Sequence, residues 1–162
     1  MKSTFIKYFK AGLCLWLIGM FTSCLTSGLE ELPAFDTADI TDIRFDFRYK
    51  DASSTWIDNE PVVKVVSLTI QNKVIDTASG TVTCTLAVPA ANGTFTEAIR
   101  QQVSLTSVVG RFYLSTAAVI VPVEGAPVLG VPGDFSATRK YKVTAADGTT
   151  KVWTISVTNL SK

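Results

Sequence analysis

Two runs of alternating apolar and polar residues meet at a turn in Tyr141-Lys142-Val143-Thr144-Ala145-Ala146-Asp147-Gly148-Thr149-Thr150-Lys151-Val152-Trp153-Thr154-Ile155-Ser156-Val157. The apolar residues that share one side of each run are Tyr141, Val143 and Ala145, then Trp153, Ile155 and Val157. Strict alternation over this length is typical of strands that bury one face, and Asp-Gly is a common turn. The stretch therefore predicts a β-hairpin near the end of the chain.

The length of the hairpin loop decides which residues face one another. A two-residue turn would place Tyr141 opposite the polar Thr154 and would leave Trp153 on the wrong face. A three-residue loop at 146–148 restores the match, because a shift of one residue moves every side chain to the other face. Gly148 then takes the left-handed position of a type I turn with a G1 bulge. We expect Tyr141 and Trp153 to be partners and Trp153 to be buried.

Alternation of the same kind recurs earlier in the chain. The first strand is expected at 40–49, and its solvent face would carry Asp42, Arg44, Asp46 and Arg48 in alternating charge. Further strands are expected at 62–75, 81–88, 103–105, 111–115 and 119–121, where Pro122 would stop the last. Residues 97–100 fit a helical turn or a strand, and 124–134 reads as a loop. About seven short strands with frequent turns indicate an all-β fold, an antiparallel Ig-like β-sandwich.

The C-terminal stretch, with Pro132-Gly133-Asp134-Phe135-Ser136 before it, resembles a recurring pattern of Bacteroidota lipoproteins. That pattern is Asp-Phe-Ser, a spacer, then Tyr-x-Val-Thr-Ala-x-Asp-Gly-Thr-Thr-Lys, and it closes Ig-like domains of the DUF5018 type, a family of unknown function. Residues 43–45 and 103–106 look similar too, so the resemblance covers about 38–158. Arg139-Lys140 and 111–113 depart from the pattern. The resemblance implies an Ig-like envelope domain and carries no catalytic residues.

The first residues have the parts of a secretory signal. Lys2, Lys7 and Lys10 form a positive segment without acidic residues, and 11–21 is almost wholly apolar. This apolar run is too short to span a bilayer, which takes roughly 20 residues. The segment therefore predicts export of the chain rather than a membrane-spanning helix.

Phe21-Thr22-Ser23-Cys24 resembles the lipobox of a bacterial lipoprotein precursor, with Phe21 where leucine is usual. The resemblance implies cleavage before Cys24, lipid on its sulfur, and the membrane as a partner through that lipid. The alternative is an ordinary signal with a coincidental cysteine. Cys14 is a poor rival, because the bulky Leu13 precedes it inside the apolar run.

The expected organisation is a cleaved signal peptide at 1–23, a lipidated Cys24 and flexible tether at 24–37, and an Ig-like domain at 38–160. Glu30-Glu31 in the tether resembles a signal for export to the outer face of the outer membrane, although it lies farther from Cys24 than usual. We expect a lipid-anchored outer-membrane protein that is surface-exposed rather than periplasm-facing. The alternative is that the acidic pair only solvates the tether.

Composition excludes several functions. Three of the fifteen basic residues and none of the fourteen acidic ones lie in 1–23, so the remainder has twelve against fourteen, a net charge of −2. No basic field attracts nucleic acid. The chain has no histidine, the commonest general base and metal ligand. We therefore expect no metal, no cofactor and no enzyme. After cleavage Cys84 is the one free thiol, and alternation places it in the core.

Five side chains are candidates for function. Trp56 and Asp58 lie in a polar loop and Tyr113 in a middle strand, so these three are candidate ligand contacts. For Trp56 the alternative, a side chain that folds back as a lid on the core, is the favoured one. Thr37 and Thr77 lie in two Asp-Thr-Ala motifs that resemble Bacteroidota O-glycosylation sites. The function expected is a binding module for a glycan or an envelope protein. The alternative is a structural or assembly subunit of an envelope complex or fibre, which an unpaired edge strand would favour.

Overall fold

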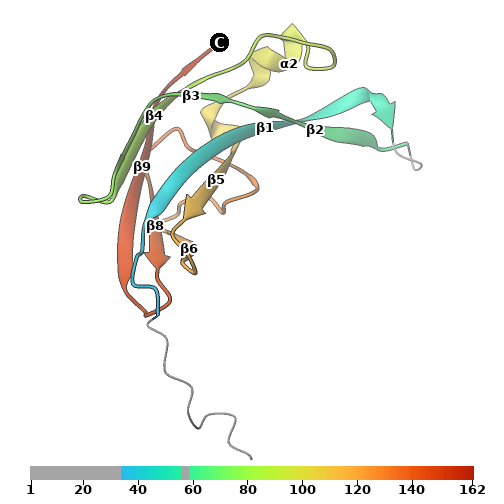
Figure 1. The fold of residues 1–162 in the computed structure, drawn as a ribbon. Helices are drawn as coiled ribbons and strands as arrows, with labels where there is room; N and C mark the ends of the chain where they lie inside the picture. Colours follow the sequence, from blue (N-terminus) through green and yellow to red (C-terminus); the bar gives the residue numbers. More distant parts are fainter. Residues whose placement is uncertain (1–33, 56–58) are drawn as a thin grey trace, which may run out of the picture. The chain divides into compact units, whose positions relative to one another are not determined.

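The structure is a computed structural model that describes residues 34–55 and 59–162 (Figure 1). Its strands are β1 (Ile40–Thr55), β2 (Pro61–Ser67), β3 (Thr69–Asp76), β4 (Thr81–Ala87), β5 (Val108–Leu114), β6 (Val119–Val123), β7 (Pro132–Gly133), β8 (Arg139–Thr144) and β9 (Thr150–Ser161). Sheet A has the order β2-β1-β5-β7, and sheet B has the order β3-β4-β9-β8-β6. The predicted all-β sandwich is confirmed.

The β8–β9 hairpin forms in the predicted register. Tyr141 lies opposite Trp153, and both side chains are fully buried. Ala145 N–H donates to the Thr149 carbonyl at 2.8 Å, and Gly148 N–H donates to the Ala145 carbonyl at 3.1 Å. The loop is therefore 146–148, and Gly148 has the left-handed φ of 91° that the bulge requires.

The core lies where the inner faces of the two sheets meet. Phe45 of β1 packs edge-on against Phe135 at 5.1 Å between ring centroids, and Phe112 of β5 packs edge-on against Tyr141 of β8 at 5.2 Å. Edge-to-face pairs at this spacing are favourable because ring edges are positive and ring faces negative. The Tyr141 hydroxyl donates to the Pro127 carbonyl at 2.8 Å. This cluster joins the two sheets across the sandwich.

One strand pair departs from the antiparallel pattern. β4 runs parallel to β9, with Val82 opposite Ile155 and Cys84 opposite Val157. A hairpin turn fixes only one neighbour of β9, so its other neighbour can run either way. Cys84 is buried as predicted, and burial raises the pKa of its thiol to about 11.

The strand expected at 62–75 is two strands, and this is the main correction to the fold. β2 pairs with β1 in sheet A, whereas β3 pairs with β4 in sheet B. Leu68 lies between them, is buried, and donates its N–H to the Phe45 carbonyl at 2.9 Å. The alternation of side chains continues through Leu68, so the pattern gives no sign that the chain changes sheet.

The segment between β4 and β8 contains three further corrections. The strand expected at 103–105 does not form, because Ser104 accepts from Thr106 N–H and begins a 3-10 helix at Leu105–Ser107. β6 continues through Pro122 to Val123, which an edge strand allows because the missing N–H faces outward. The expected loop at 124–134 includes β7. The open alternative at 97–100 resolves as helix α2 (Glu97–Gln102), capped by Thr96.

Candidate functional site

The structure describes three of the predicted functional residues. Tyr113, Thr37 and Thr77 are within the described part of the chain, whereas Cys24, Trp56 and Asp58 lie outside it. The predictions for lipidation at Cys24 and for ligand contact at Trp56 and Asp58 therefore remain predictions.

Tyr113 lies on the outer face of sheet A. It is on β5, opposite Asp42 of β1, and is 46% exposed. The Arg44 guanidinium carbon lies 5.7 Å from the centre of the Tyr113 ring, within the range of a cation–π contact. The ring therefore lies at the surface beside a charged neighbour and is partly exposed to solvent.

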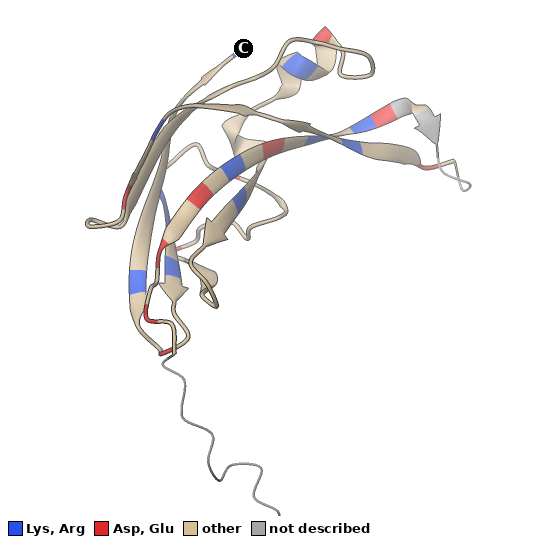
Figure 2. Cartoon of the chain, in the orientation of Figure 1, with Lys and Arg blue, Asp and Glu red and all other residues tan. Residues whose placement is uncertain are grey.

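Figure 2 shows acidic and basic residues alternating along β1, but not all of their side chains are exposed. Asp46 is only 3% exposed, although it lies on the outer face with Arg44 and Arg48. Arg111 of β5 contacts Asp46 at 2.7 Å, and the Ser67 hydroxyl donates to it at 2.8 Å. The prediction that all four charged residues are solvated is wrong at Asp46, because neighbours from β5 and β2 cover its carboxylate.

A cleft of about 240 Å³ opens beside this surface, where β2 ends and the chain crosses to sheet B. Its walls are Asp42, Ile43, Arg44, Phe45, Ser67, Leu68, Ile70 and Lys73. The cleft exists because β2 pairs with β1 only as far as Asp46, so that the first part of β1 has no neighbour on that side. Figure 1 shows β1 as a long curved strand that has β2 beside only one part of its length.

Asp42 and Lys73 hold the two walls of the cleft together. Lys73 Nζ lies 2.5 Å from Asp42 Oδ1, and the same oxygen accepts from Ile43 N–H at 2.9 Å. The hydrogen bond from Lys73 lowers the pKa of the Asp42 carboxyl, and the Ile43 N–H adds to the effect. The cleft thus presents a fixed anion beside the cations of Lys73 and Arg44.

This arrangement offers an aromatic face, a guanidinium, a carboxylate and a hydroxyl within one surface. Such groups can stack on sugars and other polar ligands and form hydrogen bonds with them. Within residues 34–55 and 59–162 no group of three or more Cys, Asp or Glu side chains gathers as a metal site would require.

A second polar cluster was missed by the sequence analysis. Lys64 of β2 contacts Asp51 at 2.6 Å and the Thr94 hydroxyl at 3.1 Å, and Tyr49 also contacts that hydroxyl at 3.1 Å. The hydrogen bonds from Lys64 and then Ser53 hold the pKa of Asp51 well below its usual range. Lys64 shares the parity of the inward residues of its strand, and a charge at an inward position is a signal that a partner is present.

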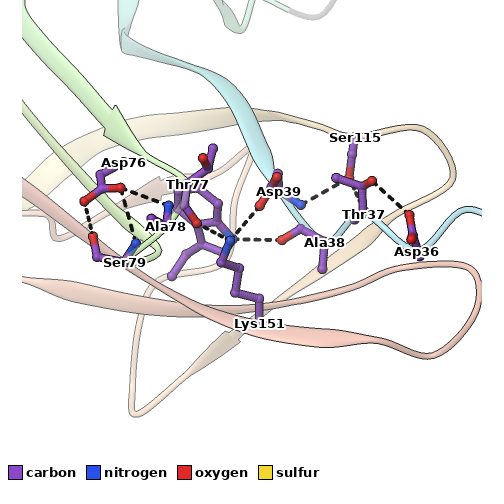
Figure 3. Close-up of polar contacts among 11 residues, drawn as sticks. Asp36, Thr37, Ala38, Asp39, Asp76, Thr77, Ala78, Ser79, Ser115 and Lys151 are labelled. Atoms are coloured by element: carbon purple, nitrogen blue, oxygen red, sulfur yellow. Dashed lines mark hydrogen bonds and ion pairs between the residues drawn. The ribbon is translucent and has the colours of Figure 1, made fainter.

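The two Asp-Thr-Ala motifs lie close to each other in the fold (Figure 3). Thr77 is exposed in the turn between β3 and β4, and Thr37 is exposed just before β1. Lys151 of β9 lies between them, since its Nζ contacts Asp39 at 2.8 Å and also donates to the Thr77 carbonyl. The structure therefore brings together two motifs that the sequence separates, and both threonine side chains face solvent.

The backbone around both motifs is fixed. The Asp76 carboxylate accepts from Ala78 N–H at 2.9 Å and from the Ser79 hydroxyl at 2.6 Å, and the Ser79 hydrogen bond lowers the pKa of Asp76. The Ser115 hydroxyl donates to the Thr37 carbonyl and accepts from Asp39 N–H at 3.2 Å. Each threonine is thus presented on an ordered segment (Figure 3).

The described residues form an all-β domain with a polar cleft beside the outer face of sheet A. The chain belongs to the DUF5018-related family, which matches residues 40–156. It is 40% identical to a Bacteroides fragilis protein of known structure that is provisionally described as secreted; the match has a TM-score of 0.72 and covers 80% of this chain and 100% of that one. No curated protein matches the chain.

A second solved structure is more distant. It is provisionally described as a glycoside hydrolase of Bacteroides thetaiotaomicron, with 23% identity and a TM-score of 0.40. The match covers 82% of this chain but only 27% of that protein.

Proposed function

We propose that this protein is a lipid-anchored envelope lipoprotein whose domain binds a glycan through the outer face of sheet A. The observation that carries the proposal is the exposed Tyr113 ring, held by Arg44 beside a cleft of about 240 Å³. An aromatic ring supplies the apolar face of a sugar with a stacking surface, and the carboxylate of Asp42 accepts from hydroxyl groups. Trp56 and Asp58 would add a second contact from their loop.

A glycan array probed with residues 25–162 tests the proposal. The match to the Bacteroides fragilis protein covers 80% of this chain and the whole of that one. A domain of this size therefore occurs as a chain of its own, which supports independent folding. Wild-type protein should bind a defined class of glycan, and Tyr113→Ala should lose about two- to twelvefold in affinity, since stacking of this kind contributes about 0.5–1.5 kcal/mol. The matched control is Val152→Ala, which removes a 51% exposed side chain from sheet B. Equal binding by both variants would exclude the Tyr113 face.

The loop residues need a separate variant. Trp56→Ala should weaken the same binding if Trp56 contacts the glycan, and should instead lower the melting temperature if Trp56 covers the core. Measuring both affinity and melting temperature distinguishes these two roles.

The anchor is the second part of the proposal. The described residues contain no helix long and apolar enough to span a membrane, and the similar Bacteroides fragilis protein is provisionally described as secreted. Acyl chains on Cys24 would hold the domain at the membrane, because two or more chains bind stably where one binds only marginally. Labelling with palmitate should be lost in Cys24→Ala; label that persists would refute the anchor. Digestion of intact cells with protease tests whether the domain faces outward.

Thr37 and Thr77 are proposed as O-glycosylation sites. Both hydroxyl groups are exposed on ordered segments around Lys151, so a transferase would reach them. Mass spectrometry of protein from the native host should show one glycan lost in Thr37→Val and one in Thr77→Val. An unmodified wild-type mass would end this proposal.

An assembly role is the second candidate function, and the free edge of sheet A favours it. β2 is the outermost strand of sheet A, and an open strand edge is the surface to which another chain adds a strand. Co-purification of an envelope protein, together with a negative glycan array, would support this role over glycan binding.

A further inference from the structure

The strand edges of the two sheets are protected unequally. A sheet edge presents unpaired backbone groups, and natural proteins blunt such edges with prolines, bulges, charges or very short strands. The edge strand β3 has a bulge between Gln71 and Val74, with Asn72 at a left-handed φ of 50°. The edge strand β6 contains Pro122, and β7 has only two residues. Each of these edges is poorly suited to accept another strand.

The open part of β1 is protected in another way. Hydrogen-bonded residues alternate along an antiparallel pair, and Leu68 donates to the Phe45 carbonyl, so Ile43 also faces the side that β2 has left. Its N–H already donates to Asp42 Oδ1, and Lys73 contacts the same oxygen. The Asp42 carboxylate therefore already accepts the hydrogen bond from Ile43 N–H, which an added strand would need.

The outer edge of β2 lacks such protection. The same alternation pairs Val62, Lys64 and Val66 with β1, so the backbone groups of Val63 and Val65 point away from the sheet. The side chains of Val63 and Val65 are 54% and 56% exposed. The register of β2 is continuous over residues 62–67, with its proline only at the first position of the strand. Its lysine, Lys64, is held on the opposite face by Asp51.

We infer that the outer edge of β2 binds an extended, acidic segment of a protein partner, which adds a strand to sheet A. The N–H and C=O groups of Val63 and Val65 would form the main-chain hydrogen bonds, and their exposed side chains would contact alternate apolar residues of the partner. The inference names the partner of the assembly role proposed above and rests on that role, not on glycan binding. Its main-chain contacts lie along the outer edge of β2, and β1 lies between β2 and the strand that carries Tyr113.

The charges beside β2 specify the chemistry of the partner. Arg48 lies opposite Val65 and Lys50 opposite Val63, and both cations are exposed on the same face as those valines. The Arg48 guanidinium donates to the Gly130 carbonyl at 2.7 Å, and Gly130 bonds to Gly110 of β5, so Arg48 reaches away from β2. Lys50 forms no ion pair with a carboxylate within the described residues. A strand with a carboxylate opposite Lys50 would be attracted. A second copy would instead bring another lysine to this edge, which disfavours a dimer through it.

Synthetic peptides test the inference with the folded protein unchanged. The probe is a fluorescent peptide of alternating valine and glutamate, and its matched control alternates valine and lysine. Fluorescence anisotropy with residues 25–162 should detect binding of the acidic peptide, weakened by added salt, and little binding of the basic one. N-methylation of one set of alternate residues should abolish binding and methylation of the other set should not, because alternate N–H groups point to opposite edges of a strand.

Two variants locate the binding edge. Val65→Pro removes an outward N–H that has no partner within the sheet, and it should weaken binding about tenfold or more. Val65→Thr keeps that N–H and should bind within about threefold of wild type. Thermal melting of both variants establishes whether they fold. If Val65→Pro does not fold, the methylated peptides still test whether main-chain hydrogen bonds at the edge of a strand carry the binding.

Three results would overturn the inference. These are no binding of the acidic peptide, equal loss with either methylation pattern, and a concentration-dependent dimer of the protein that Val65→Pro abolishes. The third result would assign the edge to a second copy of this chain. Val65→Pro should still bind glycan on the array. Loss of peptide binding without loss of glycan binding would separate strand addition at β2 from glycan binding.

Discussion

The β8–β9 hairpin and the β1–β2 pair are both antiparallel, but their outer faces have different surroundings. The hairpin buries Tyr141 and Trp153 on its inner face, and its outer face carries the exposed Val152 and Lys142. The β1–β2 pair also buries an inner face, yet its outer face carries the buried carboxylate of Asp46, and its pairing ends at the cleft.

The difference lies in where a neighbouring strand departs. From Lys140 to Thr144, β8 is paired on both sides, with β6 and with β9, so its backbone polar groups are satisfied by the two ladders. β1 loses its neighbour when the chain crosses at Leu68 to the other sheet, and the freed edge must be satisfied by side chains such as Asp42. Polar side chains therefore gather at the end of β2, and a candidate binding surface forms there.

The largest expected effect is in the hairpin. Trp153→Ala should lower the free energy of unfolding by about 3–5 kcal/mol, because it empties a fully buried site and removes the hydrogen bond from Trp153 Nε1 to the Ala38 carbonyl. Val152→Ala, on the exposed face of the same strand, should change it by no more than about 0.5 kcal/mol. Urea unfolding followed by fluorescence or circular dichroism measures both. Similar losses for the two variants would mean that the register is wrong.

A smaller effect is expected on the outer face of β1. Asp46→Ala should cost about 1–3 kcal/mol, since it removes the carboxylate that accepts from Ser67 and pairs with Arg111. Asp42→Ala should cost less, because Asp42 is far more exposed and Lys73 can be hydrated once freed. Urea unfolding at neutral pH gives the ranking. A harmless Asp46→Ala would show that the covered carboxylate does not stabilise sheet A.

The smallest effect is a pH dependence at Asp51. Hydrogen bonds from Lys64 and Ser53 lower its pKa in the folded state, so the carboxylate stabilises the fold above its unfolded pKa of about 3.9. That stabilisation is lost progressively as the pH falls below this value toward the lower folded pKa. The unfolding free energy of Asp51→Asn should therefore fall less steeply with acid than that of wild type. Parallel slopes in urea titrations between pH 2 and pH 5 would contradict the assignment.

The sequence predicts those parts of the fold that depend on residues close together in the chain. The register of Tyr141 and Trp153 follows from one loop length, and burial of Cys84 follows from alternation. The change of sheet at Leu68 leaves the alternation intact, so no local pattern marks it, and the parallel β4–β9 pair joins segments about seventy residues apart. At the candidate site, Tyr113 was identified from its residue type, but the cleft beside it depends on Leu68 and was missed. The exposure of Asp46 was predicted wrongly, because the side chains that cover its carboxylate, Arg111 and Ser67, lie on other strands.

Mapping the bound glycan by NMR tests the central claim most directly. Amide spectra of residues 25–162 are recorded while the glycan selected on the array is added. If the outer face of sheet A binds it, the largest shifts occur at Asp42, Arg44, Lys73 and Tyr113. Shifts confined to the outer face of sheet B, at Lys142 and Val152, would contradict the claim.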